Sequence, residues 1–277
     1  MWKNGRCWTC DTLVEGVHWD PRLSAEDVGF KAVAVSVSDL ISMGASPRWA
    51  LLSLTLPDPV DEAFVTGFAA GFGEACQRWG VGLAGGDTTR GHQHTVVTVT
   101  MGGTLNAKAL TRNGGRRGDD LWVTGTPGLA AMGYAGQDPG PAALSALRRP
   151  NPPVRFALDM TAQGLASAGM DLSDGLRSDL RRLCAASQVG ALVHVDKLPA
   201  HPELERGDLG HRARLAGGDD YQLLFTAPSA HASQIEQLSR THGIKVTAIG
   251  TLTQAGGARL DRGDWPEAPY QHFGGSA

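Results

Sequence analysis

The sequence predicts a mixed α/β (α+β) protein of two domains, and three observations support this fold class. The chain has 277 residues, of which 42% are hydrophobic, enough to bury one large core or two moderate ones. Strand-like apolar runs alternate with helical periodicities in both halves of the chain. A loop rich in Gly and Arg, residues 111–120, separates the halves, and we therefore expect domains at 1–110 and 111–277.

The first half is predicted to contain two helices and three strands. Ser24 and Asp27 have the spacing of a capping box, and Gly44 stands where a C-terminal cap belongs. The alternating valines between these caps also fit a strand, but the two caps favour a helix. A strand at 48–56 ends before a second helix, which is expected to begin at Pro59 and to bury an aromatic stripe. Further strands are predicted at 81–87 and 94–105.

The second half alternates in the same way. Strands are predicted at 121–125, 191–195, 221–227 and 244–252, and helices near 153–168 and 229–242. In DLSDGLRSDL, residues 171–180, Leu172, Leu176 and Leu180 have helical spacing, which predicts a helix with Asp171 and Asp174 on another side. Residues 139–153 are rich in Pro and predict an irregular surface connection.

Charge and apolar patterning exclude some classes of partner. The formal net charge is −3, and the sequence has no basic stripe that could bind the phosphates of a nucleic acid. No apolar run is long enough for a membrane span or a signal peptide, so we expect a cytoplasmic protein without a membrane partner. Of the four cysteines, Cys7 and Cys10 form a single CxxC pair, which is a weak zinc or redox signal and favours ordinary reduced thiols.

Aspartates recur at the ends of apolar segments, beside Gly, Ser or Thr, whereas the common nucleotide, zinc and hydrolase motifs are absent. Each such aspartate alone fits a helix cap or a turn. The set is Asp11, Asp39, Asp87, Asp171, Asp174, Asp219 and Asp220.

Convergence of these segments would create a need for cations. Two carboxylates about 4 Å apart repel by roughly 4 kcal/mol at an effective dielectric constant of about 20. Oxygen ligands without His or Cys suit Mg²⁺ or Mn²⁺, which also bind substrate phosphates. An acidic cluster beside Gly-Gly loops therefore suggests a polyphosphate held through metal ions.

The chain resembles the thiamine-monophosphate kinases of the aminoimidazole ribonucleotide synthetase-like superfamily. The resemblance rests on segments that occur in the family's order over nearly the whole chain: DTLVEGVHW, KAVAVSVSDLISMGASPRWALLSLTLP, GGDTTRG, ALTRNGGRRGD, VTGTPGLAAMG, DLSDGLRSDL and LAGGDDYQLLF. It implies a two-domain, synthetase-like fold. The N-terminal mixed-sheet domain would pair with its copy in a homodimer, and a C-terminal α/β domain would cover the ATP site.

The implied activity is transfer of the γ-phosphoryl group of ATP to thiamine monophosphate, giving thiamine diphosphate. The acceptor phosphate is already an anion at neutral pH, so no general base is required. Catalysis would consist of in-line positioning and charge neutralisation by several Mg²⁺ ions. No catalytic side chain is expected beyond this positioning by metals.

The resemblance also implies a set of site residues. The metal ligands would be Asp11, Asp39, Asp87, Asp171 and Asp174; the ATP contacts Gly86, Asp87, Arg112 and Ser173; and the contacts to thiamine monophosphate His18, Asp219 and Tyr270.

Two features depart from the family pattern. Family members carry a Gly-Asp-Asp segment before DTLVEG that supplies further metal ligands, whereas here only ten residues precede Asp11. The residue before Asp11 is usually Thr and is Cys10 here, a poor ligand for Mg²⁺. The alternative hypothesis is therefore an impaired or non-catalytic ATP-binding homodimeric module. A third hypothesis keeps the superfamily but changes the acceptor, so that the reaction would be, for instance, an amidine cyclisation or the phosphorylation of selenide.

Overall fold

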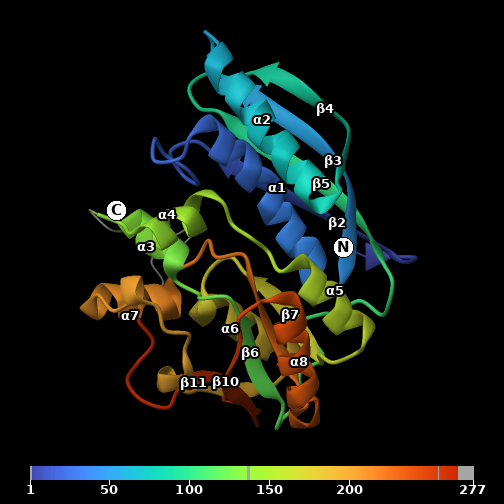
Figure 1. Cartoon of the computed structure of the whole chain (residues 1–277), viewed down its shortest axis with the longest axis vertical. Helices are drawn as coiled ribbons and strands as arrows, with labels where there is room; N and C mark the ends of the chain where they lie inside the picture. Colours follow the sequence, from blue (N-terminus) through green and yellow to red (C-terminus); the bar gives the residue numbers. More distant parts are fainter. Residues whose placement is uncertain (1, 136–137, 255, 268–277) are drawn as a thin grey trace.

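Two sheets, each with its own helices, make up the molecule. The computed structural model describes residues 2–135, 138–254 and 256–267. Figure 1 shows the first sheet with helices α1 and α2 in the upper half of the view and the second sheet in the lower half. The mixed α/β class predicted from the sequence is confirmed.

The first sheet has five strands in the order β1-β2-β5-β3-β4. Neighbouring strands are antiparallel except for the parallel pair β3 and β4. Its elements are β1 (Trp2–Lys3), β2 (Arg6–Val14), α1 (Ala25–Ser42), β3 (Ala45–Leu56), α2 (Glu62–Trp79), β4 (Gly82–Arg90) and β5 (Val96–Leu105).

The second sheet has six strands in the order β11-β8-β10-β6-β9-β7, antiparallel except for β11 and β8. Its strands are β6 (Asp120–Thr124), β7 (Ala168–Leu172), β8 (Gly190–Val193), β9 (Gln222–Ala227), β10 (Val246–Thr253) and β11 (Ala258–Leu260). Its α-helices are α3 (Leu129–Ala135), α4 (Pro141–Arg148), α5 (Val154–Ala162), α6 (Leu176–Ser187), α7 (Gly207–Ala216) and α8 (Ala232–His242). Short 3₁₀ turns occur at Val195–Lys197, Pro202–Leu204 and Ser229–His231.

Helix α1 lies between the two halves of the molecule. The predicted capping box is present, since the Ser24 side chain accepts from the Asp27 backbone and the Asp27 side chain accepts from the Ser24 backbone. The helix packs on β2, β3 and β5 of the first sheet and also touches α4, α5 and β7 of the second half. Every residue from 28 to 38 is buried, because both sides of the helix are covered. Its valines therefore alternate without forming a strand.

Helix α2 packs along α1 and begins later than predicted. Asp61, not Pro59, precedes it: the Asp61 carboxylate accepts the backbone N–H groups of the first helical turn. The helix ends at Gly80 in a left-handed conformation. Phe68 and Phe72 of the predicted aromatic stripe are fully buried against α1 and belong to the core.

Three expectations for the second half differ from the structure. Residues 139–153 contain α4, which buries Ala143 and Leu147, so the segment is not wholly irregular. In residues 171–180, Asp171 and Leu172 end strand β7, and α6 starts only at Leu176. Helices α3 and α7 were not predicted, because both are short and glycine-containing and pack against each other. Within the described ranges, no helix is long and apolar enough to cross a bilayer.

Candidate active site

A cavity of about 680 Å³ lies where the two halves meet. Its walls come from β2 and the turn after it, from α1, from the β7–α6 turn, and from α3, α7 and the Gly-Gly-Asp-Asp-Tyr segment. Of the residues predicted for the site, it is lined by Asp11, His18, Asp39, Asp171, Ser173, Asp174 and Asp219. The fold therefore brings together four of the acidic segments, which lie up to 208 residues apart in the sequence, from Asp11 to Asp219.

Asp11 and Asp39 form the part of the cluster that belongs to the first half. The Thr9 hydroxyl donates to the carboxylates of both Asp11 and Asp39, and the Ser36 hydroxyl donates to Asp11 over 3.0 Å. Burial and the nearby charge of Asp39 raise the pKa of Asp11 to about 7, and burial also raises the pKa of Asp39. The hydrogen-bond donors to these carboxyls are neutral hydroxyl groups, which do not offset the effect of burial on the two pKa values.

Asp171 adds a third carboxylate from the end of β7. It is almost fully buried, and the Ser38 hydroxyl of α1 donates to it over 3.2 Å. Burial raises its pKa well above the usual range, and the charges of Asp39, Asp179 and Asp11 raise it further. Three carboxyls from three segments therefore interact electrostatically in one place.

The turn between β7 and α6 is shaped by Asp179, a residue that the sequence analysis did not select. Its buried carboxylate accepts the backbone N–H groups of Ser173 and Asp174 over 3.1 and 3.0 Å. Gly175 precedes the helix with a φ of +93° and offers no side-chain cap. Asp174 lines the cavity and pairs with Arg182, so it does not cap α6.

The acidic cluster fits Mg²⁺ in its chemistry. Within residues 2–135, 138–254 and 256–267, no three His, Cys, Asp or Glu side chains are close enough to hold one ion by themselves. Mg²⁺ usually takes only one or two carboxylates and completes its shell with water and phosphate oxygens. Burial and mutual repulsion raise the pKa values of Asp11 and Asp171, and a bound cation would offset that repulsion.

Gly86 and Asp87 lie away from this cluster within the chain. Their strand, β4, is separated from β2 by two other strands, which places its backbone about 14 Å from that of Asp11. Asp87 is the cross-strand neighbour of Ser53, which continues to Thr98 and Thr12 on the next strands. This row of side chains lies on the face of the sheet that points away from α1. One chain therefore does not bring Asp87 into the cavity.

The other two predicted ATP residues, Ser173 and Arg112, differ in position. Ser173 lines the cavity, in the turn held by Asp179. Arg112 is exposed and does not line the cavity, but its charge lowers the pKa of Asp39, against the larger effect of burial. This places the Arg112 guanidinium within electrostatic reach of the acidic group.

A second group of cavity residues surrounds His18 and Asp219. The His18 ring accepts the Val14 backbone N–H, and the Tyr134 hydroxyl donates to the His18 carbonyl oxygen. Asp219 forms an ion pair with Lys31 of α1, which is completely buried. Tyr270, the third predicted substrate contact, lies outside the described residues.

The polar residues of α1 and the aromatic residues beside the cavity were missed. Lys31, Ser36 and Ser38 each contact a carboxylate of the cavity, and each comes from the stretch of α1 in which every residue from 28 to 38 is buried. A polar side chain in a helix buried on all sides needs a partner, and this signal was present in KAVAVSVSD. Tyr134 and Asp179 carried no comparable local signal.

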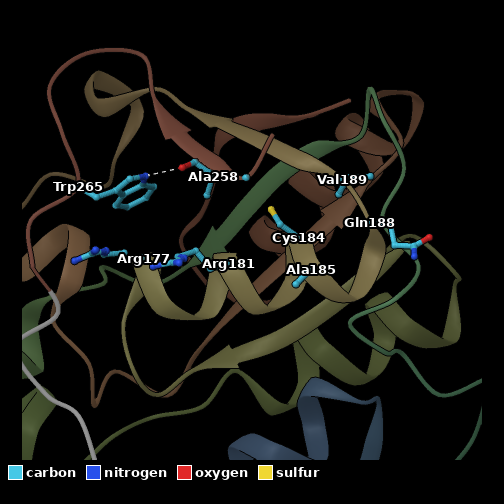
Figure 2. Close-up of a pocket in the computed structure, with 9 residues that line it drawn as sticks. Arg177, Arg181, Cys184, Ala185, Gln188, Val189, Ala258 and Trp265 are labelled. Carbon is cyan, nitrogen blue, oxygen red and sulfur yellow. Dashed lines mark hydrogen bonds between the residues drawn. The ribbon is translucent and has the colours of Figure 1, made fainter. Parts of the chain in front are cut away.

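A second hollow, of about 540 Å³, lies between α6 and the segment around Ala258 and Trp265 (Figure 2). Arg177 and Arg181 border it, and the Trp265 indole N–H donates to the Ala258 carbonyl oxygen. None of the predicted site residues that the structure describes lines it, and no carboxylate is among its described lining residues. The candidate active site is therefore the cavity between the two halves.

Comparison with known proteins identifies the family. Residues 3–105 match the model of the AIR synthase related protein, N-terminal domain, and residues 116–262 match that of its C-terminal domain. The thiamine-monophosphate kinase of Escherichia coli K12 is 38% identical over 253 residues, which cover 88% of this chain and 77% of that protein. The chain belongs to the thiamine-monophosphate kinase family.

Solved structures agree with this membership. A thiamine-monophosphate kinase from Stenotrophomonas maltophilia K279a has a TM-score of 0.86 at 34% identity, over 94% of this chain and 86% of that one. The structure of AaThiL complexed with AMPPCP and TMP has a TM-score of 0.85 at 31% identity, over 97% and 87%. The hydrogenase maturation protein HypE of E. coli shares the fold, with a TM-score of 0.78 at 17% identity over 96% and 88%.

Proposed function

We propose that this chain transfers the γ-phosphoryl group of ATP to the phosphate of thiamine monophosphate, giving thiamine diphosphate. The observation that carries the proposal is the carboxylate cluster in the wall of the cavity between the two halves. Members of its family bear the name of this kinase, and one of the similar structures is AaThiL complexed with AMPPCP and TMP. Two phosphorylated substrates repel each other, and cations held by such a cluster would offset their negative charges.

Asp11, Asp39, Asp171 and Asp174 would hold Mg²⁺, which supplies positive charge between the phosphates of donor and acceptor. The chain itself contributes position and water exclusion. The hydroxyls of Thr9, Ser36 and Ser38 fix the carboxylates, so that little reorganisation is needed when substrates bind. The acceptor phosphate is already an anion, and no side chain has to remove a proton from it.

Ser173 in the cavity wall and Arg112, whose charge acts on Asp39, would be the ATP contacts of this chain. The backbone of Ser173 is fixed by Asp179, and the guanidinium of Arg112 can neutralise phosphate charge near Asp39. His18 and Asp219 would contact thiamine monophosphate, in the part of the cavity bordered by Tyr134. Donor and acceptor would then meet at the carboxylate cluster.

A second copy of the chain would complete the assembly. All nine residues of β4 are exposed, and Leu51 and Leu83 are 43% and 55% exposed on the same region of the first sheet. An exposed edge strand with apolar neighbours is a typical protein interface. A homodimer through this region would cover it and would give Gly86 and Asp87 a role beside a partner's substrates.

The experiment that tests the function is direct detection of product. The protein is incubated with ATP, Mg²⁺ and thiamine monophosphate, and thiamine diphosphate is measured by chromatography. Asp171→Asn should lower kcat at least about 100-fold, a loss of about 3 kcal/mol of transition-state stabilisation. Glu236→Gln, the same change at an exposed position of α8, should leave activity unchanged.

Two results would contradict the proposal. Nucleotide binding by the wild type without any diphosphate formation would indicate the non-catalytic ATP-binding module instead. Turnover of ATP with another acceptor in place of thiamine monophosphate would keep the phosphoryl transfer and change the substrate.

A further inference from the structure

The hollow between α6 and the segment around Ala258 and Trp265 is a second candidate binding site. Its volume of about 540 Å³ lies within the range of small-molecule pockets, which is about 300–1,000 Å³. None of the described residues lines both this hollow and the cavity between the two halves. A ligand bound in the hollow would therefore contact residues that the proposed function does not use.

One side of α6 forms the basic wall of the hollow. The residues of this helix that line the hollow recur every three or four positions, which places them on one side of the helix: Arg177, Arg181, Cys184, Ala185 and Gln188. Arg182, the ion-pair partner of Asp174, is not among them. The two guanidinium groups of the hollow therefore belong to a different side of α6 from the arginine that pairs with the acidic turn.

Both arginines have N–H donors to offer to a ligand. The Arg177 guanidinium donates to the Pro266 carbonyl oxygen and keeps further donors, since a guanidinium carries five N–H groups. The Arg181 side chain is exposed, and within the described part of the chain it has neither a hydrogen-bond nor an ion-pair partner. Because guanidinium groups bind phosphate oxygens in bidentate geometry, the pair fits a phosphorylated ligand.

The charge of the hollow differs from that of the chain as a whole. The formal net charge is −3, yet the described lining combines two arginines with no carboxylate. Asp264 and Glu267 lie close to Trp265 in the sequence, but Glu267 lines the cavity between the two halves, and Asp264 is exposed and lines neither space. The hollow is therefore complementary in charge to an anion.

The rest of the lining is aromatic and apolar. The Trp265 ring is half-buried, and its indole N–H donates to the Ala258 carbonyl oxygen over 2.9 Å, which holds the ring in place. In Figure 2, this ring and the two arginine side chains lie toward one end of the drawn residues, and Val189 lies toward the other. An indole held in this way can stack on a planar ring of a ligand whose phosphates reach the arginines.

We infer that this hollow binds a nucleotide, with its phosphate groups at Arg177 and Arg181 and its base against Trp265. A neutral base suits the hollow better than the positively charged thiazolium ring of the thiamine phosphates, because the two guanidinium groups repel that ring. The arginines themselves supply the positive charge that the phosphates need. Binding in the hollow therefore requires no Mg²⁺, in contrast to binding at the carboxylate cluster.

The test titrates the protein with ADP in the presence of a metal chelator and measures binding by calorimetry. The wild type should bind one ADP per chain. Arg181→Gln should raise Kd at least about tenfold, the loss expected for a hydrogen bond between charged groups. Trp265→Leu should raise Kd at least about fivefold through lost stacking, and inorganic pyrophosphate, which lacks the base, should bind at least about fivefold more weakly than ADP.

Controls separate binding from folding. Arg155→Gln, the same substitution at an exposed arginine of α5, should bind ADP like the wild type. The melting temperature of Arg181→Gln without ligand should stay within about 2 °C of the wild-type value, since the side chain is exposed. The inference is overturned if the wild type binds no ADP without metal, or if Arg181→Gln binds it as tightly as the wild type. It is also overturned if pyrophosphate or thiamine diphosphate binds at least as tightly as ADP.

Discussion

Three aspartates within residues 171–180 differ in what they contact. Asp171, near the end of strand β7, accepts a hydrogen bond from the Ser38 hydroxyl. Asp174 forms an ion pair with Arg182, and Asp179 accepts the Ser173 backbone N–H in the turn that follows the strand. Their spacing in the sequence does not distinguish these roles, because the roles depend on where the helix begins. It begins after Gly175, so Asp171 and Asp174 project from a strand end and a turn.

At the residue scale, we predict that Asp179→Ala loosens this turn. The substitution leaves the backbone N–H groups of Ser173 and Asp174 without their acceptor, at a cost of about 1–3 kcal/mol. Urea denaturation should show this loss, and KM for Mg-ATP should rise severalfold because Ser173 and Asp174 line the cavity. Asp159→Ala, at an exposed position of α5, is the control. A loss of stability with unchanged KM would limit Asp179 to a structural role.

A second prediction at this scale concerns pH. The pKa of Asp11 is raised to about 7, and that of Asp171 is raised as well. Below about pH 7, the folded protein without metal therefore keeps protons on these carboxyls. Mg²⁺ must displace them, and nucleotide-dependent Mg²⁺ binding should therefore strengthen by up to about tenfold per pH unit between about pH 6 and pH 8. Calorimetry in buffers of different ionisation enthalpy measures the released protons. Binding at about pH 6 without proton release would contradict the prediction.

The raised pKa of Asp11 also determines how the free energy of unfolding of the metal-free protein changes with pH. The folded state keeps a proton on Asp11 that the unfolded chain releases near pH 4, so stability falls as pH rises from about 4 to 7. Asp39→Asn removes a charge that raises this pKa and should flatten the fall. Urea midpoints measured with a chelator across this range would show it. An equally steep fall in the variant would contradict it.

At the element scale, the contact between α1 and α2 depends on glycines. A Cβ atom at Gly71 would lie 1.8 Å from the Glu26 carbonyl oxygen, whereas one at Gly73 would meet nothing within 4 Å. Gly71→Ala must push the helices apart and should cost at least about 2 kcal/mol. Gly73→Ala should be neutral or stabilising by up to about 1 kcal/mol, since Ala favours helix. Thermal melting of both variants checks this; equal melting temperatures would contradict it.

The ends of α1 and α2 differ in how well the sequence predicts them. The capping box of α1 is a local hydrogen-bond pattern and was predicted with the right residues. For α2, Pro59 suggested the start, but Asp61 caps the helix two residues later. Helices α4 and α7 are stabilised by packing of Ala143, Leu147 and Leu215; neither has a side-chain cap, and Pro141 at the first position of α4 is the local signal that the sequence offered.

At the scale of the whole molecule, the proposed homodimer predicts that charges on the exposed part of the first sheet disrupt the assembly. Leu51→Glu and Leu83→Glu place charges on the exposed part of the first sheet and should shift the protein from dimer to monomer in light scattering. Val60→Glu changes a comparably exposed apolar residue outside this sheet and should leave the assembly unchanged. If Asp87 acts beside a partner's substrates, the monomeric variants should also lose activity. Activity retained in a monomer would contradict that role.

The sequence by itself determined the α/β class, the family, and the acidic segments at the ends of apolar runs. Each of these features is a local pattern, which consecutive residues of the chain carry without any contact between distant segments. Tertiary structure decided which of these segments meet. Asp11, Asp39, Asp171 and Asp174 converge on one cavity, whereas β-sheet register places Asp87 on the opposite face. It also decided that Asp219 lines the cavity and pairs with the buried Lys31, while the Asp220 carboxylate accepts the backbone N–H groups of Gly128 and Ala130 at the start of α3. Such directions arise from contacts between distant segments, and no local pattern in the chain encodes them.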